Sequence, residues 1–159
     1  RLGEELLKIP EARISKDVMI IPGTDGQKMS KSYNNYIDIF LPEKQLKKNV
    51  NTIITDSIPL EEPKNPDTCN VYKLFELIAD EEQTLNLRRK YLAGNFGYGH
   101  AKKELLGLIL DTYKREREQY NNYMNNLPEL EAKLTAGEDK ARDIANDLLA
   151  VVRKRLGFA

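Results

Sequence analysis

The chain has 159 residues, 40% hydrophobic and 31% charged, with 25 basic and 25 acidic side chains and a net charge of zero. This composition is typical of one or two helix-rich globular domains, and nucleic-acid binding would have to depend on local basic patches. The single cysteine, Cys69, and the single histidine, His100, exclude an internal disulfide and a cysteine zinc cluster, and argue against a histidine metal site or a Ser-His-Asp triad.

Segments that direct a protein to a membrane or out of the cell are not recognisable in the sequence. The longest apolar runs are shorter than 18 residues, so we predict no membrane-spanning helix. No secretory signal peptide is visible, which favours a cytoplasmic location. The sequence opens on Arg1-Leu2-Gly3 without a methionine, and we expect it to be a piece of a longer protein.

The first predicted element is a short buried strand over residues 18–21, bounded by Asp17 and Pro22. Four consecutive apolar residues fit a strand better than a helix of ten or more. A loop with two glycines, Gly23 and Gly26, follows directly. Because open α/β sheets bind their ligands in loops at strand ends, we expect this loop to contact a ligand.

From residue 41 onward the apolar residues recur at helical spacing. Leu41-Pro42 predicts a helix start, and the proline-rich stretch 57–70 predicts an irregular connector. A short helix is predicted over 71–79, and the next helix should begin after Asp80 as N-cap and end at Gly94. Residues 97–100 form a predicted turn.

The C-terminal third predicts three further helices. The longest covers 100–125, with Leu105, Ile109, Tyr113, Tyr120 and Met124 on one stripe. A shorter helix should run from Pro128 to about Gly137, and a last helix from 138 to 156. The last helix is expected to bury Ala141, Ile144, Ala145, Leu148, Val151 and Val152. The predicted fold is therefore mainly α, a bundle of five or six helices preceded by a strand-and-loop remnant.

Residues 28–32, Lys-Met-Ser-Lys-Ser, carry the most chemistry in the sequence and are called the signature loop below. A tight turn would bring the ammonium groups of Lys28 and Lys31 to one polyphosphate, while Ser30 and Ser32 add hydroxyl donors. Such groups stabilise the negative charge that develops in phosphoryl or adenylyl transfer. The alternative interpretation is a solvated lysine–serine surface loop.

The signature loop matches, letter for letter, the KMSKS motif of class I aminoacyl-tRNA synthetases. Over nearly its whole length the chain resembles tryptophanyl-tRNA synthetases of the bacterial type. The glycine-rich turn at 97–102 and the closing helix favour tryptophan over tyrosine or methionine as the amino acid. The residues that carry the resemblance outside the loop are 9–14, 53–57, 70–72, 97–102 and 137–157.

The resemblance implies that residues 1–40 end a Rossmann-like α/β catalytic domain and that residues 41–159 form an α-helical anticodon-binding domain. It implies an aminoacyl-tRNA ligase that activates tryptophan with ATP, releases pyrophosphate and transfers tryptophan to tRNA(Trp). ATP is expected to come with Mg²⁺, and no protein-bound metal is expected. The full-length protein is expected to be a homodimer that contacts no membrane.

The resemblance also assigns roles to single residues. Lys28 and Lys31 would stabilise the departing pyrophosphate and are the predicted catalytic residues, Lys31 above all. Val18 would lie against the adenine, although a core position in the strand is an equal interpretation. The HIGH-type motif, the tryptophan pocket and a second nucleotide-binding element are missing, so we expect the chain alone to be inactive. The predicted ATP-binding residues are Val18, Lys28, Met29, Ser30, Lys31 and Ser32.

Basic clusters in the helical part predict contacts with tRNA phosphates. Acidic residues are interleaved with them, so solvated helix faces are the alternative interpretation. Two other functions stay open: another class I aminoacyl-tRNA synthetase, or a helical RNA-binding module without catalytic activity. The predicted tRNA-binding residues are Arg88, Arg89, Lys102, Lys103 and Arg115.

Overall fold

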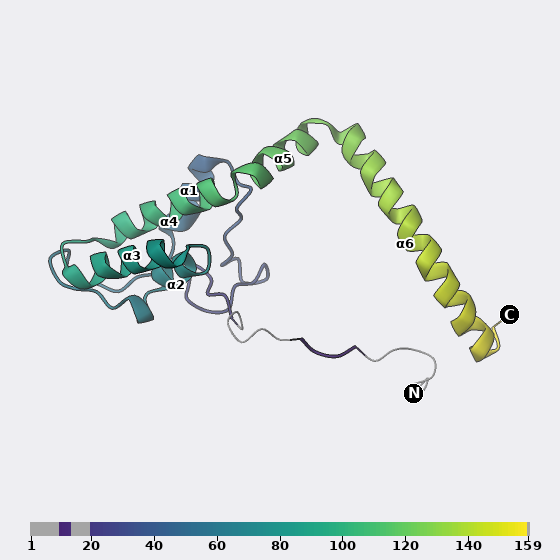
Figure 1. The fold of residues 1–159 in the computed structure, drawn as a ribbon, viewed down its shortest axis with the longest axis horizontal. Coiled ribbons are helices and arrows are strands. Elements are labelled where there is room, and N and C mark those ends of the chain that lie inside the picture. The colour runs from purple at the N-terminus through teal and green to yellow at the C-terminus, as the bar shows by residue number, and fades with distance from the viewer. Residues whose placement is uncertain (1–9, 14–19, 159) are drawn as a thin grey trace. The chain divides into compact units, whose positions relative to one another are not determined.

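The computed structural model describes residues 10–13 and 20–158 of the chain. Helices dominate this described part, which confirms the prediction of a mainly α fold (Figure 1). The chain divides into two compact units, one of residues 15–119 and one of residues 1–14 with 120–159. Each unit is described separately below. The predicted domain division at residue 40 stays a prediction.

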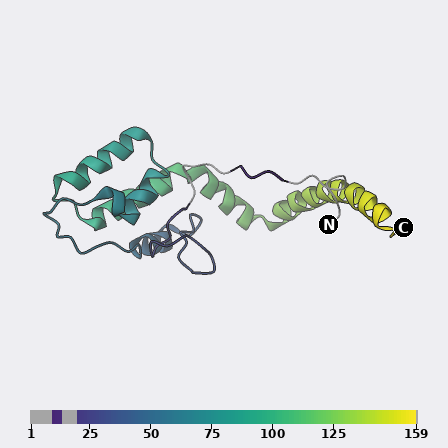
Figure 2. The ribbon, with the colours of Figure 1, turned by 90° about the horizontal axis from the view of Figure 1, so that it is seen from below.

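In its described residues, the unit of residues 15–119 contains four complete α-helices, a 3-10 helix and the start of α5 (Lys114–Asn125) (Figures 1 and 2). Helix α4 contacts both α1 and α2, and α2 also contacts α3, so α2 and α4 form the centre of the unit. The buried apolar residues come from all four helices, including Leu46, Tyr72, Leu87 and Leu105. The elements are α1 (Glu43–Asn51), η2 (Pro66–Thr68), α2 (Asn70–Glu76), α3 (Glu81–Ala93) and α4 (Tyr98–Thr112).

Helix α3 begins and ends where the sequence predicts. The Asp80 carboxylate accepts a hydrogen bond from the Gln83 amide at 2.8 Å, and the Gln83 side chain accepts one from the Asp80 amide at 3.1 Å. This reciprocal pair satisfies donors that a helix start leaves free. At the other end Gly94 has φ +75, and a β-carbon there would lie 2.5 Å from the Glu61 carbonyl oxygen. The backbone conformation and the lack of space both require glycine.

The long helix predicted over 100–125 is wrong in one respect, because it is two helices. Helix α4 ends at Thr112, Tyr113 has φ −100 and ψ 19, and α5 covers Lys114–Asn125. Leu105 and Ile109 are buried, as predicted, whereas Tyr120 and Met124 are 40% and 50% exposed. No glycine or proline stands at or next to Tyr113, so the sequence gives no local signal that the helix ends there.

Arg117 ties the start of α5 to the segment that follows the signature loop. Its guanidinium group donates one hydrogen bond to the Ile39 carbonyl and another, at 2.9 Å, to the Leu41 carbonyl. An arginine can bridge two carbonyls because its donors are fixed in a planar fork. The contact joins positions 76 to 78 residues apart in the sequence, which no local pattern reveals.

The two helices predicted over 128–137 and 138–156 are one continuous helix, α6 (Leu127–Leu156). Gly137 lies inside this helix. The helix propensity of the residues around it offsets the free-energy cost of a glycine in a helix. The expected burial of the last helix is wrong, since no residue of α6 is buried among those described. The helix ends at Gly157 with φ +77, where the Phe158 amide donates to the Arg153 carbonyl in a C-terminal glycine cap.

The irregular connector predicted over 57–70 is confirmed over 57–69, except for the single turn η2, and Asn70 already belongs to α2. Sequence reasoning missed its anchor, Lys64, which is only 2% exposed. The Lys64 ammonium donates to the carbonyls of Pro59, Leu60 and Glu62 at 2.7, 3.3 and 3.0 Å. A buried ammonium is tolerated here because each of its three N–H groups has an acceptor.

The predicted strand at 18–21 is described only from Ile20, and neither Ile20 nor Ile21 belongs to a strand. Within the described residues the β pairing is a single antiparallel bridge between Pro22 and Lys28. Residues 14–19, including Val18, lie outside the described part.

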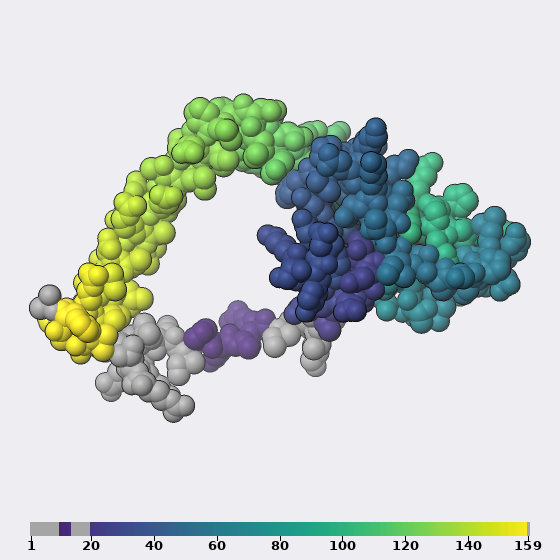
Figure 3. Space-filling view, turned by 180° about the vertical axis from the view of Figure 1, so that it is seen from behind, coloured from purple at the N-terminus to yellow at the C-terminus, as the bar shows by residue number. Residues whose placement is uncertain are grey.

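In the space-filling view, residues 20–60, dark blue, form much of the visible face of the unit of residues 15–119 (Figure 3).

Candidate functional site

The turn before the signature loop is closed by backbone hydrogen bonds. The Gly23 amide donates to the Gln27 carbonyl at 2.6 Å, and the Gly26 amide donates to the Gly23 carbonyl at 3.0 Å. Gly26 has φ +80, the left-handed region that favours glycine, and a β-carbon there would lie 2.6 Å from Nδ2 of Asn70. The two glycines therefore allow a closely packed turn to form before the signature loop.

Asn35 is the centre of the hydrogen bonds around the signature loop. It is 2% exposed, and its Oδ1 accepts from the Ser30 amide at 2.7 Å. Its Nδ2 donates to Oδ1 of Asp25 at 2.8 Å and to the Lys28 carbonyl at 3.1 Å. Sequence reasoning missed Asn35, although an asparagine shortly after the motif was a visible signal. The side chain links the turn to the loop on both sides of Met29.

Asp25 is ionised more readily than an ordinary aspartate. The hydrogen bond from Asn35, with a second from the Gln27 amide, lowers the pKa of Asp25 below its usual 3.8. Both donors favour the charged carboxylate. The hydrogen bonds that shape the turn are therefore made by a carboxylate across the neutral pH range.

The two lysines of the signature loop keep their ammonium groups in solvent. Lys28, Lys31 and Ser32 are exposed, whereas Met29 and Ser30 are half-buried. The Ser32 amide donates to Oγ of Ser30 at 3.2 Å, which compacts the loop. Lys28 and Lys31 have no ion pair or hydrogen bond from their side chains to other described residues. Two positive charges are thus available to an anionic ligand.

The backbone of the signature loop is largely occupied by internal hydrogen bonds. The Met29 amide donates to the Ile21 carbonyl at 2.8 Å, and the Ser30 amide is taken by Asn35. The amides of Met29 and Ser30 are therefore not free to bind a phosphate in this conformation. The side chains of Lys28 and Lys31 are the groups best placed to contact phosphate oxygens.

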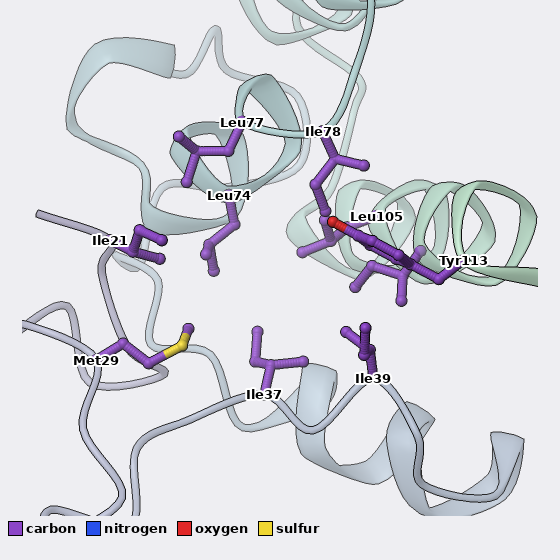
Figure 4. A pocket seen from close by; sticks show the side chains of 10 residues that line it. Ile21, Met29, Ile37, Ile39, Leu74, Leu77, Ile78, Leu105 and Tyr113 are labelled. Carbon is purple, nitrogen blue, oxygen red and sulfur yellow. The ribbon is translucent and has the colours of Figure 1, made fainter. Parts of the chain in front are cut away.

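Met29 anchors the loop to the helical core. Its side chain points into an apolar cavity of about 320 Å³ rather than toward solvent (Figure 4). If Met29 contacts a nucleotide, as the sequence predicts, it must do so through its backbone. The cavity is lined by Ile21, Met29, Ile37, Ile39, Leu74, Leu77, Ile78, Leu105, Ile109 and Tyr113.

Two of the five predicted tRNA-binding residues have partners within the chain. Arg88 forms a bidentate ion pair with Asp67, with distances of 2.7 and 3.2 Å, and this pair lowers the pKa of Asp67. The Lys102 ammonium donates to the Asn51 carbonyl at the end of α1 at 2.9 Å, and burial lowers the pKa of Lys102. The remaining three, all exposed, are Arg89, Lys103 and Arg115.

Other kinds of site find no support in the part of the chain that the structure describes. No group of three or more His, Cys, Asp or Glu side chains there is arranged to hold a metal ion. The helices described are also too short or too polar to cross a lipid bilayer. The signature loop is therefore the candidate site.

Comparison with known proteins identifies the class. Residues 1–114 match the family described as tRNA synthetases class I (W and Y), and the chain belongs to this family. It is 47% identical over 156 residues to the tryptophan–tRNA ligase of Fusobacterium nucleatum, covering 98% of this chain and 48% of that protein. It is 42% identical over 154 residues to the tryptophan–tRNA ligase of Campylobacter jejuni. The predicted resemblance is confirmed.

A solved structure agrees with the sequence relatives. The crystal structure of tryptophanyl-tRNA synthetase from Campylobacter jejuni, complexed with ADP and tryptophan, matches with a TM-score of 0.84 and 42% identity. The match covers 96% of this chain and 48% of that structure. The chain thus spans about half the length of the relatives it matches.

Proposed function

We propose that this chain is the part of a tryptophan–tRNA ligase that carries the KMSKS loop and the helical tRNA-binding region. The observation that supports this most is the 47% identity to such a ligase over 98% of the chain. The signature loop adds a physical reason, because Lys28 and Lys31 are exposed without side-chain partners among the described residues. The complete enzyme would use tryptophan, ATP and tRNA(Trp).

In the proposed reaction, a carboxylate oxygen of tryptophan attacks the α-phosphorus of ATP. The bond from that phosphorus to the bridging oxygen breaks, and pyrophosphate leaves with the extra negative charge. The ammonium groups of Lys28 and Lys31 stabilise this charge as it develops. The terminal hydroxyl of tRNA(Trp) then attacks the aminoacyl carbonyl, and AMP leaves. Ser30 and Ser32 are proposed to contact ATP, and Val18 to contact its adenine.

The proposal extends to partners and surroundings. ATP would enter with Mg²⁺ held by its phosphates. Arg89, Lys103 and Arg115 are the better candidates for tRNA contact, because Arg88 and Lys102 already bind other parts of the chain. We also propose that the complete ligase is a homodimer in the cytoplasm, where it would supply charged tRNA for protein synthesis.

Amino-acid-dependent exchange between ATP and pyrophosphate tests the proposal in the complete synthetase that contains this chain. Tryptophan should support exchange, whereas tyrosine should not. Exchange with tyrosine alone would keep the family and refute the specificity. No exchange with any amino acid would favour a helical RNA-binding module. The 159-residue chain by itself should show no exchange with tryptophan.

A further inference from the structure

We propose that Asn35 is a positioning residue that holds the signature loop in the shape its lysines require. The proposal deepens the function proposed above and rests on it for the catalytic consequence. Asn35 itself is buried, with only 2% of its surface exposed. Its effect would therefore pass through Lys28 and Ser30, the loop residues whose backbone it binds.

The side-chain hydrogen bonds of Asn35 join the turn at Asp25 to the signature loop at Lys28 and Ser30. Both N–H groups of its amide are used, one by the Asp25 carboxylate and one by the Lys28 carbonyl, while its oxygen accepts from the Ser30 amide. The backbone carbonyl of Asn35 also accepts from the Thr24 amide at 2.8 Å. A buried amide with every donor satisfied specifies one arrangement of the groups around it.

Close packing leaves Asn35 little freedom. A β-carbon at Gly23 would lie 2.4 Å from Nδ2 and 2.5 Å from Cγ of Asn35, so the amide fills the space beside this glycine. The Met29 side chain of the same loop points into the apolar cavity. The loop is therefore held both by the hydrogen bonds of Asn35 and by the apolar packing of Met29, while Lys28 and Lys31 stay exposed.

Replacing Asn35 with alanine would remove all three side-chain hydrogen bonds and leave the Ser30 amide and the Lys28 carbonyl without these partners. We expect the loop to sample other conformations and the two ammonium groups to spend less time near the leaving pyrophosphate. Since a misplacement of about 1 Å can cost about 10²-fold in rate, a loss of that size is expected in the chemical step.

Hydrogen exchange of the 159-residue chain tests the conformational part without any activity. In Asn35→Ala, amides in a peptide covering residues 28–32 should exchange at least several-fold faster, whereas those of α4 should not change. Asn65→Ala is a matched control, because Asn65 also accepts a backbone hydrogen bond, from Asp67 at 2.9 Å, but lies outside the loop. Equal loop exchange in Asn35→Ala and the unsubstituted chain would overturn the proposal.

Kinetics of the complete synthetase test the catalytic part. Asn35→Ala should lower kcat of tryptophan-dependent exchange by about 10²-fold and leave KM for tryptophan within about twofold. Asn35→Asp should also be impaired, because it sets a carboxylate against both Asp25 and the Lys28 carbonyl. A change confined to KM for tryptophan, or an unimpaired Asn35→Asp, would contradict positioning through these bonds.

The two proposals fail separately. If the unsubstituted synthetase shows no exchange with any amino acid, the proposed function is refuted. The hydrogen-exchange comparison would still decide whether Asn35 holds the loop. If the synthetase is active but Asn35→Ala matches Asn65→Ala in both measurements, only the role of Asn35 is refuted.

Discussion

Asn35 and Lys64 are polar side chains that the fold buries together with their hydrogen-bond partners. Neither belongs to the KMSKS motif, and neither lies on an apolar stripe that periodicity would detect. Their partners are mostly backbone groups, whose positions follow from the folded chain and not from residue types. Sequence reasoning named the lysines of the loop as candidate site residues but missed Asn35, which binds the loop backbone, and Lys64, which binds the connector.

The pKa of Asp25 is predicted to depend on Asn35. Because the hydrogen bonds lower this pKa in the folded chain, they contribute stability above about pH 4, which is lost as the pH falls through the folded value, below 3.8. An NMR titration should place the Asp25 pKa below 3.8 in the unsubstituted chain and higher in Asn35→Ala. The same pKa in both proteins would show that Asn35 does not bind the carboxylate in solution.

Lys64→Met should lower the free energy of unfolding of the unit of residues 15–119 by about 2 kcal/mol. This is the usual cost of losing hydrogen bonds from a charged donor. Methionine fills a similar volume but leaves the carbonyls of Pro59, Leu60 and Glu62 without the ammonium. Urea unfolding followed by circular dichroism should show a lower midpoint for Lys64→Met. Lys47→Met, at an exposed position of α1, is the control, and equal midpoints for the two variants would argue against the anchoring role.

At the scale of elements, helix boundaries were predictable where a residue itself specifies the cap. Asp80 and Gly94 bound α3 as expected, since a side-chain acceptor and a left-handed glycine act locally. The break at Tyr113 and the continuity through Gly137 were not predictable. In the first case no helix-breaking residue is present, and in the second a glycine lies within a helix that continues past it.

Gly137→Ala should stabilise α6 by up to about 1 kcal/mol, because alanine restricts the unfolded chain and has the higher helix propensity. A β-carbon at this position meets no atom within 4 Å, so no clash offsets the gain. Circular dichroism at increasing temperature should show that α6 retains its helical signal to a higher temperature. A loss of helicity in Gly137→Ala would instead support the two separate helices predicted from the sequence.

At the scale of the whole molecule, the five-letter motif and several scattered matches were enough to predict the family, which the comparisons confirm. The mainly helical fold was also predictable, from the helical spacing of the apolar residues. The exposure of the last helix was not predictable. The pattern of Ile144, Leu148 and Val151 indicates an apolar face, but periodicity cannot tell whether a partner covers it. In the described structure these residues are 75%, 50% and 46% exposed.

The central claim is that the exposed lysines of the signature loop stabilise the pyrophosphate released from ATP. The most direct measurement is tryptophan-dependent ATP–pyrophosphate exchange by the complete synthetase carrying Lys31→Ala, beside Lys47→Ala as an exposed lysine outside the loop. We predict that Lys31→Ala lowers the exchange rate by about 10²- to 10³-fold, the usual effect of removing one group that stabilises transition-state charge, while Lys47→Ala does not. Equal exchange rates in the two variants would contradict the account.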